Sequence, residues 1–182
     1  VGQHASALPE SLLGPTSPLD GVVRGELEAA IPALLARHGR PWDGGDPCGP
    51  RWRVDDLDAL PPTDPGELAL GGYAMSSTRV PRRGPVRWGF LHSSRGCPHA
   101  CTFCSPTLRQ SFGARHRALP AARVVDDVLR LHRDHGVDAL YFVDDAFAHD
   151  PARVAAIGEG LRRAGRPVGW VFQSRPDQID AG

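Results

Sequence analysis

The sequence contains no lysine and no asparagine, so all 21 of its basic residues are arginine. The absence of lysine excludes a lysine Schiff base, a P-loop lysine and any other chemistry that needs a lysine amine within this chain. We attribute the bias to a GC-rich coding sequence. The 21 acidic residues bring the net charge to zero, so no overall electrostatic field favours nucleic acid or an anionic membrane as a partner.

Long apolar stretches are also missing. No run approaches the roughly 18 residues of a membrane span, and no hydrophobic signal segment stands near the start, which favours a cytoplasmic location. The chain begins with Val1, and residues 1–4 read as the end of a strand that enters a loop, so we expect a piece of a longer protein. With 182 residues, 41% of them hydrophobic, and with 21 glycines and 18 prolines, we expect one large or two small globular, loop-rich domains.

Three of the four cysteines, Cys97, Cys101 and Cys104, lie within eight residues, whereas Cys48 lies far upstream and is interpreted as an unpaired loop cysteine. This crowding does not fit a disulfide framework, which spreads an even number of cysteines over a secreted chain. A tetrahedral Cys3His zinc site is one alternative, although no second cysteine pair forms the separated knuckle usual for structural zinc. Its fourth ligand would be His92, His99 or His116.

The other alternative is an iron–sulfur cluster, whose irons take cysteine thiolates. Three cysteines on a four-iron cube leave one iron open, and catalysis at a metal requires such an open position. The Cys-x3-Cys-x2-Cys spacing, with Phe103 before the third cysteine, resembles the signature of the radical S-adenosylmethionine (SAM) superfamily. The resemblance implies that Cys97, Cys101 and Cys104 hold a [4Fe–4S] cluster and that the open iron binds SAM. One electron, from a donor such as flavodoxin or ferredoxin, would then cleave SAM to methionine and a 5′-deoxyadenosyl radical, which takes hydrogen from a small-molecule substrate.

Strands and helices alternate after position 86. Apolar residues at 87–92 predict a strand, and the pattern from Pro120 to Gly136 predicts a helix with a proline at its start and a glycine at its end. The apolar run 139–143 predicts a buried parallel strand, Asp150–Pro151 begin a second helix that ends at Gly165, and 168–172 predict a third strand. This order predicts an α/β fold with a parallel sheet and right-handed crossovers.

Polar residues follow each of these strands. The cysteine loop follows the first strand, Asp144–Asp145 the second and Gln173–Arg175 the third, so all three sets open on the same rim. Radical SAM enzymes share a partial (β/α)6 barrel with the cluster loop after its first strand, and the resemblance implies that residues 86–182 form the N-terminal half of such a barrel.

The acidic pair after the second strand suggests a SAM contact. Residues 142–147 resemble the Asp-Asp-x-Phe variant found in the radical SAM branch with an N-terminal cobalamin-binding domain. The resemblance implies that Asp144 or Asp145 accepts hydrogen bonds from the SAM ammonium group, which a carboxylate can do. Phe103 would pack beside the cluster and against the adenine, and Arg175 is a further candidate contact.

The zero net charge conceals an asymmetry. From Leu68 to Val125 the chain is rich in arginine and has no acidic residue, with the cysteine loop in the middle. A cube with three thiolates and a SAM carboxylate is anionic, so guanidinium groups would stabilise it, and Arg95 is the favoured candidate. The same arginines would also suit a phosphate-bearing substrate or RNA, but aromatic residues are not interleaved with them, which disfavours nucleic acid.

The first 40 residues resemble the last part of a Rossmann-like cobalamin-binding domain. A Gly-x-His segment, a strand, a Gly-Glu-x-Glu segment and a helical pattern from Leu27 to Gly39 occur in that order, and Pro32 should kink or delay the helix. The resemblance implies a bound cobalamin. Its candidate contacts are Gly2, His4, Gly25 and Glu26.

These observations predict three parts: residues 1–40 as the end of a cobalamin-binding-like domain, 41–85 as a Pro/Gly-rich linker, and 86–182 as the truncated barrel. The predicted function is radical SAM chemistry, with cobalamin-dependent methyl transfer or ring formation among the reactions of the branch, and we expect no turnover from this piece alone. The alternatives are a methylthiotransferase acting on RNA or protein, which would need further ligand cysteines, and a zinc-binding interaction module.

Overall fold

The computed structural model describes residues 2–13, 15–19, 21–36, 51–64, 74–75, 85–165 and 168–179. The chain divides into two compact units. The first combines Val1–Asp55 with Gly96–His116, and the second combines Asp56–Arg95 with Arg117–Gly182. The cysteine loop therefore belongs to the first unit, although the strand that leads to it belongs to the second. The predicted domain boundaries at 40 and 85 do not coincide with these limits, and they stay predictions.

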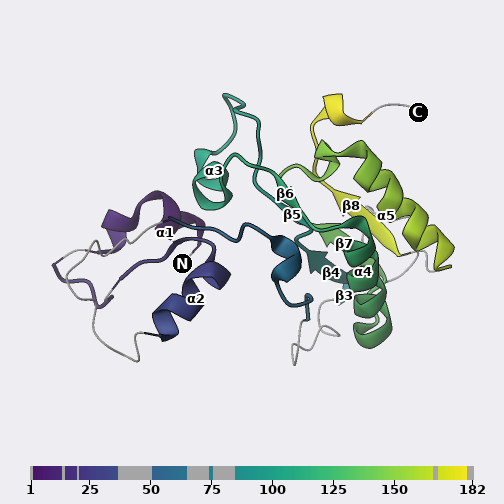
Figure 1. Ribbon diagram of the computed structural model, residues 1–182, viewed down its shortest axis with the longest axis horizontal. Coiled ribbons are helices and arrows are strands. Elements are labelled where there is room, and N and C mark those ends of the chain that lie inside the picture. Colours follow the sequence, from purple (N-terminus) through teal and green to yellow (C-terminus); the bar gives the residue numbers. More distant parts are fainter. Residues whose placement is uncertain are drawn as a thin grey trace. The chain divides into compact units, whose positions relative to one another are not determined.

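The second unit is built on a mixed sheet of four strands in the order β3-β4-β7-β8 (Figure 1). β3 (Ala74–Met75) runs antiparallel to β4 (Val86–Leu91), while β7 (Ala139–Phe142) and β8 (Gly169–Phe172) run parallel to β4. The three predicted strands are thus confirmed to within a residue or two at each end. Leu91, Phe142 and Phe172 share one register position, so the chain leaves all three parallel strands at the same edge.

Two helices connect the parallel strands. α4 (Ala121–His135) ends where Gly136 adopts a φ of 64°, and α5 (Pro151–Arg163) begins where the Asp150 carboxylate accepts the Arg153 amide at 3.1 Å. The glycine supplies the left-handed conformation of the helix end and the aspartate satisfies a free amide of the first turn, as the sequence predicts.

The core of this unit is apolar on both faces of the sheet. One face carries Phe142 and Trp170, whose rings pack with Phe147 at centroid distances of 4.4 and 5.7 Å. The other face carries Val86 and Trp88. The two helices pack on each other, and each carries buried apolar side chains. These are Val124, Val128 and Leu131 on α4, and Ile157 and Leu161 on α5.

A short antiparallel ladder joins β5 (Ser94–Arg95) to β6 (Arg117–Ala118). Ser94 pairs with Ala118 and Arg95 with Arg117, so residues 96–116 start and finish at neighbouring points. This ladder was not predicted, because two-residue strands carry no periodic pattern.

The first unit is made of short elements: helices α1 (Gln3–Ala7), α2 (Leu27–Leu35) and α3 (Pro106–Phe112), a 3₁₀ helix at Pro9–Leu12, and the parallel strand pair β1 (Arg24–Gly25) and β2 (Arg51–Trp52). β2 comes from the predicted linker, most of which lies outside the described residues. Another described part of that linker, Leu57–Ala59 in the second unit, forms a 3₁₀ helix whose Leu57 is buried.

Two details of the N-terminal prediction were wrong. Residues 3–4 lie in α1 and not at the end of a strand, because Gly2 begins a helix whose first bond runs from the Ser6 amide to the Gly2 carbonyl. Pro32 does not delay α2, which begins at Leu27; the Pro32 ring is exposed and its carbonyl still accepts from the Ala36 amide. A kink at Pro32 stays a prediction. The predicted end at Gly39 lies outside the described residues. Of the helices that the structure describes, none has the length and apolar character needed to cross a membrane.

Candidate functional site

The cysteine loop carries three thiols. Cys97 and Cys101 are partly buried, Cys104 is exposed, and none of the three forms a disulfide. Cys48, predicted to be an unpaired loop cysteine, lies outside the described residues. The loop therefore offers three sulfur ligands on one short segment, which is the kind of donor that an iron–sulfur cluster takes.

Backbone hydrogen bonds hold this loop within the first unit. The Cys97 amide donates to the Gly113 carbonyl at 3.3 Å, and the Cys104 amide donates to the Cys101 carbonyl at 3.1 Å. Arg109, on α3, donates from Nη1 to the His99 carbonyl at 3.1 Å. The loop is thus folded back on α3 and on the turn that follows it.

Gly96 begins the loop with a φ of 85°, a conformation that side chains with a Cβ rarely adopt. A Cβ at this position would lie 2.2 Å from the carbonyl oxygen of Arg115. The backbone of the returning chain therefore occupies the space that any other residue would need, and the residue before Cys97 must be glycine for this close approach.

The fit to a metal group has a chemical and a geometric side. The three thiols suit a cluster chemically, but among the described residues no group of three histidine, cysteine or acidic side chains converges on one point. The same finding applies to the Cys3His zinc alternative. The loop has the right kind of ligand for a cluster. Binding of a metal group commonly orders its own ligands, so the three cysteines would be brought together when the cluster binds.

Asp144 follows β7 and turns into the protein, with an exposed fraction of 2%. Its Oδ1 accepts the Ser93 amide at 2.7 Å, and its Oδ2 accepts the hydroxyls of Ser93 and Ser94 at 2.6 and 2.8 Å. Three donors from the segment after β4 therefore occupy both oxygens of this buried carboxylate, which leaves it poorly placed for an outside ligand.

Asp145, the other member of the pair, is only partly buried. Burial raises the pKa of its carboxyl above the usual range, and the neighbouring charge of Asp144 raises that pKa further. No hydrogen bond to Asp145 occurs among the described residues, so this carboxylate is the better candidate for an incoming cation.

Arg153, on α5, completes the buried group around Asp144. Its Nη2 donates to both the carbonyl and the hydroxyl of Ser93 at 2.9 Å, and its Nε donates to the Leu119 carbonyl at 2.8 Å. The guanidinium carbon lies 5.8 Å from the centroid of the Phe147 ring. Burial lowers the pKa of Arg153, while the charges of Asp144 and Asp150 act in the opposite direction. Sequence reasoning missed Ser93, Ser94 and Arg153, because partners 51 and 60 residues apart leave no local signal.

The remaining SAM candidates lie at the surface. The Arg175 guanidinium forms a two-pronged pair with Asp177, at 2.8 Å from Nε to Oδ1 and 2.7 Å from Nη2 to Oδ2. Phe103 has an exposed fraction of 91%, which is extreme for a phenylalanine and leaves its ring open to a stacking partner.

The candidate cobalamin contacts are used within the first unit. Gly25 has a φ of 88°, and the carbonyl oxygen of Trp52 lies 2.2 Å from the place of a Cβ, so this glycine admits β2 to close range. Glu26 has an exposed fraction of 2%, and its Oε2 accepts the Val54 amide at 3.2 Å. Gly2 begins α1, and His4 is exposed with its Nε2 3.0 Å from the Ser11 hydroxyl. Gly25 and Glu26 therefore have structural partners and do not fit a contact with a bound cofactor.

The arginines near the cysteine loop also have partners. Arg87 donates from Nη1 to the His135 carbonyl at 3.2 Å, and Arg115 lies 3.6 Å from the Asp55 carboxylate. Arg95 and Arg117 pair through their backbones in the β5–β6 ladder. Much of the acid-free segment thus stabilises its own unit.

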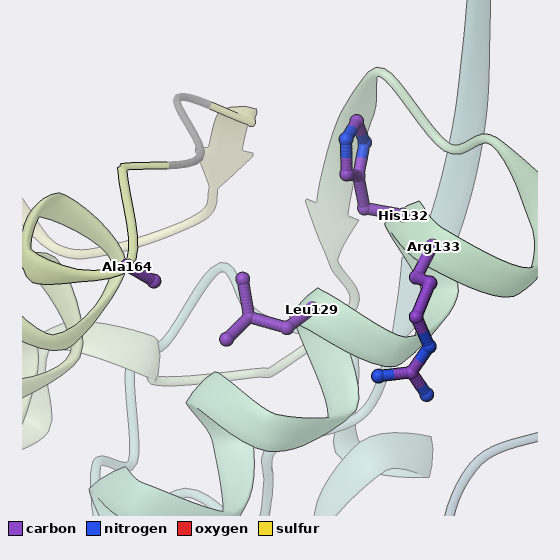
Figure 2. Close-up of a pocket in the computed structure, with 4 residues that line it drawn as sticks. All are labelled: Leu129, His132, Arg133 and Ala164. Atoms are coloured by element: carbon purple, nitrogen blue, oxygen red, sulfur yellow. The ribbon is translucent and has the colours of Figure 1, made fainter.

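A surface pocket of about 450 Å³ lies beside the C-terminal half of α4 in the second unit (Figure 2). It is lined by Leu129, His132 and Arg133 of α4 and by Ala164 at the end of α5. Arg133 is paired with Asp134 at 2.6 Å, and His132 Nδ1 lies 2.7 Å from the Val137 carbonyl. These residues lie near the start of β7, at the opposite end of that strand from Asp144, so the pocket is not part of the candidate site.

Comparison with known proteins gives methyltransferases and a cyclase as relatives. The chain is 28% identical to an uncharacterized methyltransferase of Pyrococcus horikoshii over 96% of its own length and 39% of the relative. It is 35% identical to the cytidylyl-2-hydroxyethylphosphonate methyltransferase of Streptomyces wedmorensis, over 44% of this chain and 15% of that enzyme. It is 28% identical to the anaerobic magnesium-protoporphyrin IX monomethyl ester cyclase of Synechocystis, over 70% of this chain and 26% of that enzyme. The chain thus spans well under half the length of these relatives, and no protein-family model matches it.

The names of these relatives describe methyl transfer and cyclisation, two of the reaction types that the resemblance to the cobalamin-binding branch implies. The match to the Pyrococcus protein spans nearly the whole chain, and therefore includes the cysteine loop. The resemblance to radical SAM enzymes is confirmed. The radical SAM resemblance also agrees with the observed α/β fold, in which the loop follows the first of three parallel strands.

Proposed function

We propose that the protein is a radical SAM enzyme of the methyl-transfer or ring-forming kind. The observation that carries this proposal is the loop with three thiols that form no disulfide, Cys97, Cys101 and Cys104, which follows the parallel strand β4 and the short strand β5. A cluster bound there would supply the single electron that cleaves SAM reductively. The parallel strands β4, β7 and β8 would be the start of a partial (β/α)6 barrel, and residues 1–40 the end of a Rossmann-like domain.

The chain's own residues have distinct tasks in this proposal. The three thiolates hold the cluster and leave one iron for the amino and carboxylate groups of SAM. Asp145 would accept a hydrogen bond from an N–H of the SAM amino group, because both oxygens of Asp144 already accept hydrogen bonds from Ser93 and Ser94. Phe103 offers its exposed ring to the adenine.

Cobalamin dependence, a small-molecule substrate and a flavodoxin-like or ferredoxin-like electron donor are further parts of the proposal. They rest on the resemblance and on the kinds of relatives found. Because Gly25 and Glu26 have structural partners, a cobalamin would have to be held by other residues. Equilibrium binding of hydroxocobalamin to the chain, with an expected stoichiometry of one, tests this part separately.

The decisive experiment is anaerobic reconstitution with iron and sulfide, followed by iron analysis and electron paramagnetic resonance (EPR) of the dithionite-reduced protein. We expect close to four irons per chain and a reduced-cluster signal that shifts when SAM is added. Cys101→Ala should abolish the SAM-responsive signal, whereas the matched control Cys48→Ala should retain it. One zinc per chain with no bound iron would overturn the proposal in favour of a zinc-binding module.

A further inference from the structure

The base of the cysteine loop is held by a buried polar group in the second unit. We propose that Arg153 is a positioning residue that, together with Ser93 and Asp144, clamps the two chain segments from which the loop emerges and so makes the bound cluster competent to bind SAM. Only the statement about SAM binding rests on the proposed function. The clamp itself concerns the protein without cofactor.

The first argument is where the hydrogen bonds of Arg153 end. Nη2 reaches the Ser93 carbonyl on the segment that enters the loop, and Nε reaches the Leu119 carbonyl on the segment that leaves it, at 2.9 and 2.8 Å. The Leu119 amide donates to the same Ser93 carbonyl at 2.9 Å. One planar guanidinium therefore ties both segments together just outside the β5–β6 ladder.

The second argument is burial. Ser93, Ser94, Asp144 and Arg153 have exposed fractions of 0, 1, 2 and 9%. The Ser93 hydroxyl accepts from Arg153 and donates to Asp144, and so it links a buried positive group to a buried negative one. In a site with little water these charge-assisted hydrogen bonds are strong and fix the position of each member.

The third argument is proximity along the chain. Ser93 stands four positions before Cys97, and the chain between them can span no more than about 14 Å even when fully extended. A displacement at Ser93 is therefore passed to the first cluster ligand with little slack. Asp144 is also the direct neighbour of Asp145. The same buried group therefore positions both the start of the loop and the residue proposed to contact the SAM amino group.

The test compares Arg153→Met with Arg123→Met in the whole chain. Arg123 is a matched control, since it also binds carbonyls and carboxylates of the second unit, with Nη2 3.1 Å from the Leu60 carbonyl and Nε 3.3 Å from Asp127, but it does not touch the base of the loop. Hydrogen–deuterium exchange of the cofactor-free chain is the first readout. We expect amides of residues 96–116 to exchange at least tenfold faster in Arg153→Met than in Arg123→Met.

The second readout uses the reconstituted protein. We expect Arg153→Met to weaken the SAM-induced EPR shift, with at least a tenfold rise in the SAM concentration needed for half the effect, while Arg123→Met stays within twofold of the wild type. Equal effects of the two variants on both readouts would show a general loss of stability and overturn the inference. Unchanged loop exchange in a folded Arg153→Met protein would overturn it as well.

A second pair of variants covers the case in which Arg153→Met does not fold. Ser93→Ala removes the hydroxyl bridge but keeps both charges, whereas Ser94→Ala removes one of the three donors to Asp144. We expect faster loop exchange in Ser93→Ala than in Ser94→Ala, and the reverse order would contradict the clamp. If the wild type binds no iron, the proposed function fails, and the exchange data still decide whether the clamp exists.

Discussion

Gly96→Ala is the substitution whose cost follows most directly from the structure. Alanine at a φ of 85° is strained by roughly 1–2 kcal/mol, because its Cβ crowds the backbone in the left-handed region. The new Cβ would also lie 2.2 Å from the Arg115 carbonyl oxygen, while an ordinary carbon–oxygen contact is about 3.3 Å. The carbonyl must therefore move by about 1 Å, and forced movements of this kind cost roughly 1–3 kcal/mol.

Gly113→Ala is the matched control in the same unit. Gly113 has a φ of 83°, nearly the same as that of Gly96, but a Cβ there would meet the guanidinium of Arg53 at 2.8 Å. Arg53 is exposed and can swing away, so we expect only the backbone strain of about 1–2 kcal/mol. The difference between the two variants in the free energy of unfolding therefore measures the cost of the clash with the Arg115 carbonyl alone.

The assay is urea unfolding of the cofactor-free chain, followed by circular dichroism. We expect a loss of about 2–5 kcal/mol in the free energy of unfolding for Gly96→Ala, and a smaller loss for Gly113→Ala. After reconstitution, Gly96→Ala should also hold less iron, since Cys97 is its direct neighbour. A Gly96→Ala protein that is no less stable than Gly113→Ala would refute the reasoning.

Two further substitutions test the second unit. Phe142→Ala should lower the free energy of unfolding, measured in urea, by about 3–5 kcal/mol, because the ring is fully buried against Phe147. The control Phe142→Leu should lower it far less. A loss below about 1 kcal/mol for Phe142→Ala would contradict the packing. Asp145→Asn should weaken SAM binding in EPR titrations yet raise the melting temperature at pH 7. The pKa of Asp145 is raised in the folded state, so its favourable contribution is complete only below the unfolded pKa of about 3.9 and is lost as the pH rises through the folded value. The gain in melting temperature should therefore vanish in acid. Glu159→Gln, which removes an exposed carboxylate paired with Arg162, should show no such gain.

The sequence was most informative where structure depends on neighbours along the chain. The helix from 121 to 135 with Gly136 at its end, and the helix that Asp150 and Pro151 begin, were predicted because capping residues act within one turn. The strand after each helix was predicted from a continuous apolar run. Each of these signals is local, so one sequence was enough.

The parts that could not be predicted depend on distant pairs. Asp144 and Asp145 are the same residue type at adjacent positions. Only the structure shows that Ser93 and Ser94 donate hydrogen bonds to Asp144, which leaves Asp145 as the available carboxylate. Arg153 occupies an ordinary helix position, yet it bonds to residues 34 and 60 positions away. The division of the chain, with the cysteine loop counted among the N-terminal residues, also arises from contacts that no periodicity encodes.

The two-residue ladder between Ser94–Arg95 and Arg117–Ala118 holds the two ends of the cysteine loop at neighbouring points. Since the ends of the loop are already fixed, doubling its length would cost only about 0.6 kcal/mol in closure entropy. Lengthening the loop directly after Cys104 would therefore leave the sheet and the spacing of the three cysteines unchanged, while insertions next to Ser93 or Leu119 would separate the partners of Arg153. Among related chains we therefore expect differences in loop length to occur after Cys104, and the three cysteines and the two ends of the loop to stay constant.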